Sequence, residues 1–137
     1  MTTESRREPA FEAQSDAYDL YVRGVAFLRE RHFAQAALLL ARALRLEPGR
    51  NSIREALGRA EFARGGYARA ADLFAAIVSD IPDNDYAHYA LGRCLTALGR
   101  GEEARTHLRL ARALVPLSDL YVQALEASGA SGAVRPV

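Results

Sequence analysis

Residues 51–82 read NSIREALGRAEFARGGYARAADLFAAIVSDIP, and this stretch decides the fold. Apolar residues recur at helical spacing on both sides of Gly65-Gly66, which predicts a helix, a short turn and a second helix. Pro82 cannot continue the second helix and marks its end. Ser52, with Glu55 three residues later, predicts a capping box at the start of the first helix.

The same unit occurs three times, with a period of 34 residues. Three glycines, three alanines and three prolines keep this step: Gly24, Gly58 and Gly92, then Ala36, Ala70 and Ala104, then Pro48, Pro82 and Pro116. A period shared by three residue types predicts an array of stacked helix pairs. The small Gly58 and Ala70 indicate that the two helices of a pair approach each other closely. Arrays of this kind usually present a surface for binding rather than enclose a reaction.

These residues resemble the tetratricopeptide repeat, whose signature is a Leu-Gly pair, a Gly-x-Tyr turn, an Ala, a bulky residue, a second Ala and a closing Pro. The middle unit matches at Leu57-Gly58, Gly65, Tyr67, Ala70, Phe74 and Pro82, the third at Leu91-Gly92, Gly99, Ala104, Leu108, Ala111 and Pro116, and the first at Gly24, Phe27, Phe33, Ala36, Leu40, Ala43 and Pro48. The departures are Ile77 for the second Ala, Gly101 for the turn aromatic, Arg23 and Arg31 for the usual Leu and Gly, and Leu20, Arg54 and His88 for an early Trp.

The resemblance covers about residues 16–118. It implies an all-α fold, a right-handed superhelical solenoid of antiparallel helix pairs with about seven helices. We expect helices at 17–30, 34–47, 52–64, 68–80, 86–98 and 102–115, and a capping helix at 119–128 that starts with Asp119 as its N-cap. Repeats at about 17–50, 51–84 and 85–118 then form one domain, 15–128, between flexible tails at 1–14 and 129–137.

The composition of the chain disfavours several classes of protein. The formal net charge is +1, with 18 basic and 17 acidic residues, which disfavours a dedicated nucleic-acid or anionic-membrane binder. The single Cys94 excludes a disulfide within the chain and indicates a reducing compartment. Residues 1–9 do not resemble a secretory signal, and no apolar stretch is long enough to cross a bilayer. We therefore expect a cytoplasmic protein.

One side of the first helix in each repeat is less polar than a freely exposed side should be. In the family that the sequence resembles, these helices line the concave wall of the superhelix. Tyr and Arg often carry the binding energy of protein interfaces, and Arg59 and Arg93 occupy equivalent places in adjacent repeats. We predict a groove for a peptide or helical partner segment with apolar and acidic residues, formed by Tyr18, Tyr21, Val25, Leu28, Glu55, Arg59, Phe62, Tyr86, Tyr89 and Arg93.

The same side chains have a structural alternative. The tyrosines could contact one another or the next helix, Arg93 could stack on Tyr89, and Arg59 could pair with Glu55. A second alternative is that a tail of the chain fills the groove, through Phe11 or through 134–137. In many family members a Lys/Asn/Arg clamp grips acidic chaperone tails, but the matching places here hold Tyr21, Val25, Ala56, Tyr86 and Ala90. The resemblance therefore does not imply that class of ligand.

No catalytic or metal-binding pattern occurs. His32, His88 and His107 lack metal-ligand spacing to one another or to Cys94, so we expect neither a metal nor another cofactor. Packing or surface roles are expected for His88 and His107, and a buried, unreactive thiol for Cys94. The sequence thus predicts a non-enzymatic interaction module. A homodimeric assembly unit is the alternative, and RNA binding is disfavoured by the near-zero net charge.

Overall fold

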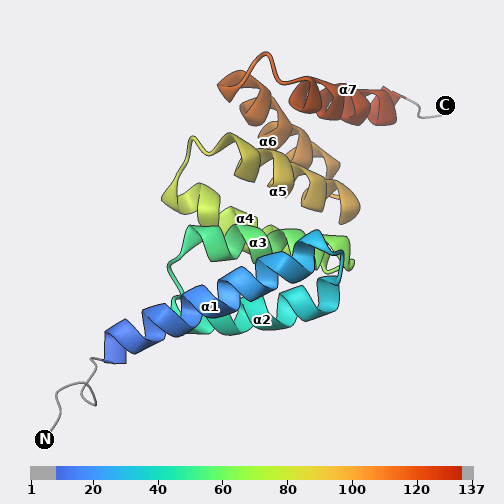
Figure 1. Cartoon of the computed structure of the whole chain (residues 1–137). Helices are drawn as coiled ribbons and strands as arrows, with labels where there is room; N and C mark the ends of the chain where they lie inside the picture. The colour runs from blue at the N-terminus through green and yellow to red at the C-terminus, as the bar shows by residue number, and fades with distance from the viewer. Residues whose placement is uncertain (1–8, 134–137) are drawn as a thin grey trace, which may run out of the picture. The chain divides into compact units, whose positions relative to one another are not determined.

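The computed structural model describes residues 9–133, which contain helices and no strand (Figure 1). The helices are α1 (Pro9–Arg29), α2 (Phe33–Leu46), α3 (Asn51–Ala63), α4 (Tyr67–Asp80), α5 (Asp85–Ala97), α6 (Gly101–Leu114) and α7 (Asp119–Ala133). They fall into two compact units whose boundary lies between Gly65 and Gly66. Unit 1 contains α1 to α3, and unit 2 contains α4 to α7.

The two outer helices are longer than predicted. α1 begins at Pro9 instead of residue 17, so the prediction of a flexible tail is wrong for residues 9–14. Proline suits the first turn of a helix, and the following residues include Ala13 and Gln14, which are good helix formers. α7 runs to Ala133 instead of 128, so the predicted tail is helical over 129–133. Residues 1–8 and 134–137 lie outside the described part of the chain.

Helix capping differs from the prediction at both α3 and α7. α3 begins at Asn51 without a side-chain cap, so the capping box of Ser52 and Glu55 is not formed. Ser118, rather than Asp119, caps α7 by accepting a hydrogen bond from the Tyr121 amide. Asn84 caps α5, because its Oδ1 accepts a hydrogen bond from the Ala87 amide at 2.9 Å.

The periodic glycines allow close helix packing in both units. In unit 1, a Cβ added to Gly24 on α1 would lie 2.6 Å from Cγ of Leu40 on α2. In unit 2, a Cβ on Gly92 of α5 would lie 2.7 Å from Cδ2 of Leu108 on α6. Any larger side chain at these positions would overlap the partner helix. The close approach that was predicted at Gly58 of the middle repeat thus occurs at the equivalent glycines of the first and third repeats.

Candidate functional site

Five of the ten predicted groove residues come together around one cavity in unit 1. This cavity of about 230 Å³ lies between α1 and α3. Its lining comprises Tyr21, Val25, Leu28 and Arg29 from α1, and Ser52, Glu55, Ala56 and Arg59 from α3. The apolar lining comes mainly from α1, and charged side chains line the cavity from both helices.

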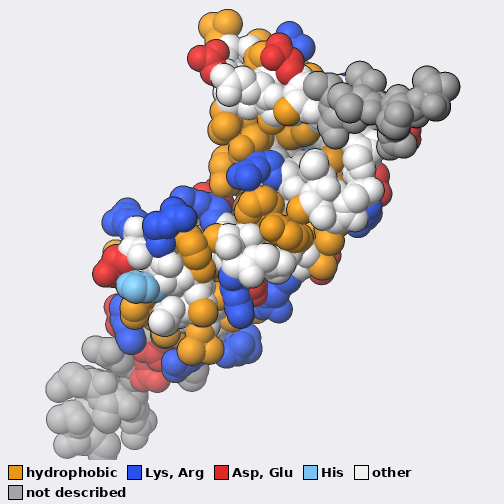
Figure 2. Space-filling model, turned by 90° about the vertical axis from the view of Figure 1, so that its right-hand side faces the viewer, with side chains coloured by type: hydrophobic (Ala, Val, Ile, Leu, Met, Phe, Trp, Pro, Cys, Tyr) orange, Lys and Arg blue, Asp and Glu red, His pale blue; other side chains and the backbone are white. Residues whose placement is uncertain are grey.

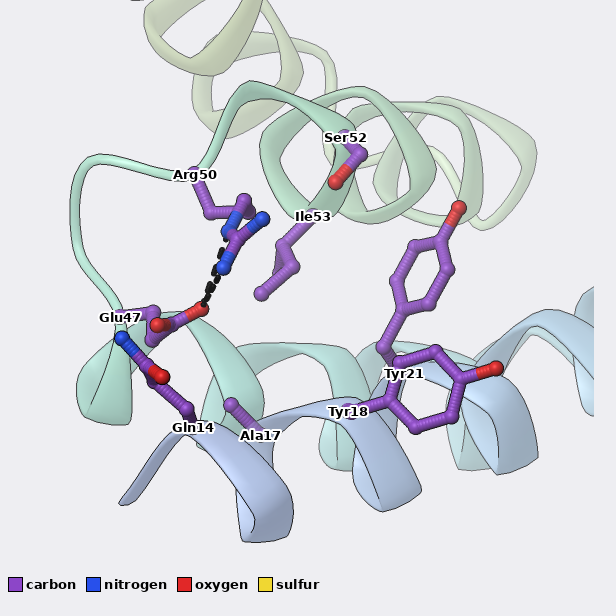
Figure 3. A pocket seen from close by; sticks show the side chains of 8 residues that line it. All are labelled: Gln14, Ala17, Tyr18, Tyr21, Glu47, Arg50, Ser52 and Ile53. Atoms are coloured by element: carbon purple, nitrogen blue, oxygen red, sulfur yellow. Dashed lines mark hydrogen bonds and ion pairs between the residues drawn. The ribbon is translucent and has the colours of Figure 1, made fainter. Parts of the chain in front are cut away.

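A second cavity of about 200 Å³ lies beside the first, and Tyr21 and Ser52 line both (Figure 3). Its remaining lining is Gln14, Ala17, Tyr18, Glu47, Arg50 and Ile53. The sequence interpretation missed Arg50 and Ile53, since Arg50 lies in the turn before α3 and Ile53 belongs to the packed side of that helix. We call the two cavities together the α1–α3 cleft.

The exposure of the predicted residues in unit 1 varies widely. Tyr18 is 66% exposed, whereas Leu28 is 9% exposed, so Leu28 contributes to the floor of the cleft rather than its rim. Tyr21, Val25 and Glu55 are half-buried. Phe62 is also half-buried but lines neither cavity.

The arginines of the α1–α3 cleft differ in their pairing. Arg50 is held by Glu47, with Nη2 2.8 Å from Oε2 of the carboxylate. Arg59 is exposed, and within residues 9–133 neither it nor Glu55 takes part in an ion pair. The alternative pairing of Arg59 with Glu55 is therefore not formed. Among the described residues, Arg59 is thus an unpaired cation in the lining of the first cavity.

The three predicted residues in unit 2 have a different environment. Tyr89 is 8% exposed, and its ring centroid lies 6.0 Å from Tyr86 and 5.3 Å from Tyr121 of α7. The Arg93 guanidinium lies over the Tyr89 ring at 5.9 Å. The structural alternative is thus confirmed here: the tyrosines contact one another and the next helix, and Arg93 stacks on Tyr89.

Tyr121 completes this aromatic cluster with a polar contact. Its hydroxyl donates to Oδ2 of Asp85 at 2.6 Å. Burial, and then the hydrogen bond to Asp85, raise the pKa of Tyr121 well above its usual value. The phenol stays neutral, and α7 is anchored to the start of α5.

His88 and His107 join α5 to α6 through their rings. His88 is 4% exposed, its Nε2 lies 2.8 Å from the Pro82 carbonyl oxygen, and its Nδ1 lies 3.0 Å from Nδ1 of His107. A carbonyl only accepts, so Nε2 of His88 donates to Pro82, and one of the two facing Nδ1 atoms donates to the other. Burial first, and His88 second, lower the pKa of His107. The prediction of a packing role is confirmed for this pair.

The remaining candidate groups offer no obvious chemistry. Cys94 is fully buried, and burial raises the pKa of its thiol to about 11, which confirms the prediction of an unreactive thiol. His32 is exposed at the start of α2 and makes no side-chain cap. Within the described residues, no three His, Cys, Asp or Glu side chains are grouped to hold a metal ion. In the same part of the chain, no helix has the length and hydropathy that crossing a membrane requires.

Comparison with known proteins agrees with this architecture. A model of the tetratricopeptide repeat matches residues 61–129, and a second model of the same repeat matches residues 21–85. The chain belongs to the tetratricopeptide repeat family. The prediction of an all-α solenoid of tetratricopeptide type is confirmed. No curated protein sequence matches the chain.

Several solved tetratricopeptide structures are similar to this chain. The first such domain of Spaghetti (RPAP3), bound to the HSP90 peptide SRMEEVD, has a TM-score of 0.82 and 18% identity over 88% of this chain and 95% of that one. MamA from Desulfovibrio magneticus RS-1 has a TM-score of 0.83 and 22% identity over 86% and 67%. The Yersinia enterocolitica secretion chaperone SycD, in complex with a YopD peptide, has a TM-score of 0.75 and 18% identity over 84% and 93%. At these identities the likeness establishes the fold.

Proposed function

We propose that this tetratricopeptide protein is a non-enzymatic protein-interaction module, and that its α1–α3 cleft binds a peptide or helical segment of a partner protein. The observation that carries the proposal is the convergence of Tyr21, Val25, Leu28, Glu55 and Arg59 on one cavity. Two similar solved structures, those of Spaghetti and SycD, contain bound peptides, which supports this class of ligand. An adaptor or chaperone-like role in the cytoplasm follows as part of the proposal.

The chemistry of the cleft indicates which segment it would bind. Tyr18 and Tyr21 offer aromatic surface at low entropic cost, and Val25 and Leu28 extend that surface below them. Arg59, with Arg29 beside it in the lining, favours a carboxylate. The proposed site omits Tyr89, because that ring is buried by packing within unit 2.

The charge distribution supports a protein ligand over a nucleic acid. Figure 2 shows basic side chains interspersed with hydrophobic and other side chains on the face in view, rather than gathered into one basic surface. The net charge of +1 would provide little of the phosphate attraction on which nucleic-acid binders depend.

The test is a binding measurement with fluorescent peptides that combine apolar and acidic residues. Arg59→Glu should weaken binding by about tenfold or more, because a close charge pair is replaced by repulsion. Arg45→Glu is the matched control, since Arg45 is exposed on α2 and lines neither cavity. Equal affinities of both variants would contradict the proposed site.

Light scattering tests the homodimer alternative. The exposed ring of Tyr18 is the feature that favours it, since aromatic side chains are enriched at protein interfaces. A monomer that binds peptide supports the interaction module. A stable dimer that is lost in Tyr18→Ala would support self-assembly instead.

A further inference from the structure

The two units contain equivalent helix pairs, but different side chains fill the space within each pair. α1 and α3 are the first helices of successive repeats, and α5 and α7 occupy equivalent positions two periods of 34 residues later. Tyr21 corresponds to Tyr89 under this shift, Ile53 to Tyr121, and Ala17 to Asp85. The structure of unit 2 therefore shows what fills the equivalent space beside the first tyrosine.

In unit 2 that space holds an aromatic ring. Tyr121 lies with its ring centroid 5.3 Å from Tyr89 at an interplanar angle of 35°, and Asp85 accepts its hydroxyl. Tyr121 is buried in the cluster that also contains Leu108 and Ala111. The ring is thus an integral part of the packing between α5 and α7.

In unit 1 the equivalent ring is missing. Ile53 and Ala17 stand at the two positions, and both line the open cavity of about 200 Å³ beside Tyr21. Figure 3 shows Ile53 and Ala17 on opposite sides of this space, with Tyr18 and Tyr21 along one edge. An engineered cavity of about 150 Å³ is large enough to bind benzene in another protein. The space in unit 1 therefore has room for one aromatic ring.

We propose that this cavity receives an aromatic side chain from the partner segment, which packs on Tyr21 as Tyr121 packs on Tyr89. This inference rests on the proposed function and names the ligand group that the α1–α3 cleft recognises. Aromatic rings prefer offset or tilted contacts with another ring, and Tyr21 supplies the required face. Because Tyr21 lines both cavities, a residue next to the ring can place a carboxylate near Arg59.

The test uses two small probes and the full chain. The probes are acetylated, amidated Phe-Glu and Leu-Glu dipeptides, titrated while the backbone amides are followed by NMR. Phe-Glu should shift the amides of Tyr21 and Ile53 and bind about three- to tenfold more tightly than Leu-Glu, as expected for an added ring–ring contact. Equal affinities of the two probes would overturn the aromatic preference.

Two variants fill the cavity from different sides. Ile53→Tyr places a ring where unit 2 has one, and should remove the preference for Phe-Glu. Ser52→Tyr starts from an exposed residue that lines both cavities, so it blocks the space without altering the core if Ile53→Tyr fails to fold. Leu38→Tyr, at an exposed position on α2, is the control and should keep the preference. A preference that survives in a folded cavity-filling variant would overturn the inference.

The outcomes separate this inference from the function on which it rests. Suppose that both probes bind with equal affinity and that Arg59→Glu weakens the binding of both. This result would overturn only the aromatic pocket. If the amide shifts caused by the probes were the same in Arg59→Glu and Ser52→Tyr as in the wild type, the α1–α3 cleft would not be the binding site. That result would overturn both proposals.

Discussion

The pair α1–α3 and the pair α5–α7 are built from the same repeat, yet one is open and the other is filled. Tyr21 lines two cavities, whereas the equivalent Tyr89 is covered by Tyr121. The difference depends on one residue of the second helix in each pair, Ile53 on α3 and Tyr121 on α7. The repeat signature therefore fixes how the helices stack, whereas a few positions outside the signature decide whether a cavity remains between them.

The largest expected effect tests whether Tyr121 is structural. Tyr121→Ala should lower the free energy of unfolding by about 3 kcal/mol, because a buried ring is replaced by a cavity. Tyr18→Ala, the control on the open side, should change it by less than about 0.5 kcal/mol, because that ring is exposed. Urea denaturation measures both values. If both variants lost a similar free energy of unfolding, the filled and open pairs would not differ in the way proposed.

The second prediction concerns what the two units share. Gly24→Leu and Gly92→Leu should each cost about 1–3 kcal/mol or more, because the new side chain meets Leu40 or Leu108. Gly101→Leu is the control, since nothing lies within 4 Å of a Cβ at that position. Normal thermal melting of either buried variant would contradict the close approach of the helices.

A pH dependence is expected in unit 2, where the histidine pair lies. The pKa of His107 in the folded protein is below its ordinary value of 6.5, so the unfolded chain binds more protons between the two values. The free energy of unfolding should therefore rise with pH through this window and fall as the solution is acidified. Besides burial, His88 on α5 lowers the pKa of His107 and Glu103 on α6 raises it, and Glu103 accepts a hydrogen bond from Arg100.

Denaturation midpoints from pH 7 to pH 5 provide the measurement. His107→Gln keeps an N–H donor for His88 but does not titrate, so its midpoint should depend less on pH than that of the wild type. His32→Gln, which changes an exposed histidine, should behave like the wild type. An unchanged pH profile in His107→Gln would exclude the pair as the cause.

The smallest expected effect compares the two equivalent arginines. Arg93→Ala should lower the free energy of unfolding by about 0.5–1 kcal/mol, since it removes a cation–π contact with Tyr89. Arg59→Ala should leave stability within about 0.5 kcal/mol but weaken peptide binding. Calorimetry and a peptide titration on both variants measure the difference. A stability loss in Arg59→Ala, or weaker peptide binding in Arg93→Ala alone, would contradict this assignment.

Some of the site was predictable and some was not. Helical periodicity correctly placed Tyr21, Val25 and Leu28 on one side of α1, because residues three and four apart share a helix face. It missed Arg50 and Ile53, since a turn residue and a core residue carry no periodic signal for a cavity. It also treated Tyr21 and Tyr89 alike, although Tyr121 already stood at the repeat position of Ile53 and differed from it in size.

Periodicity along the chain was enough to predict the helix pairs, their order and the close packing at the periodic glycines. These features depend on helical periodicity, on the small size of glycine and on the inability of proline to continue a helix, and all three act within one repeat. Which aromatic residues are buried, and where space remains, became clear from the packing of the helices. Whether a helix face is open depends on side chains from another helix. The ring of Tyr121 covers Tyr89, whereas the smaller Ile53 leaves a cavity beside Tyr21.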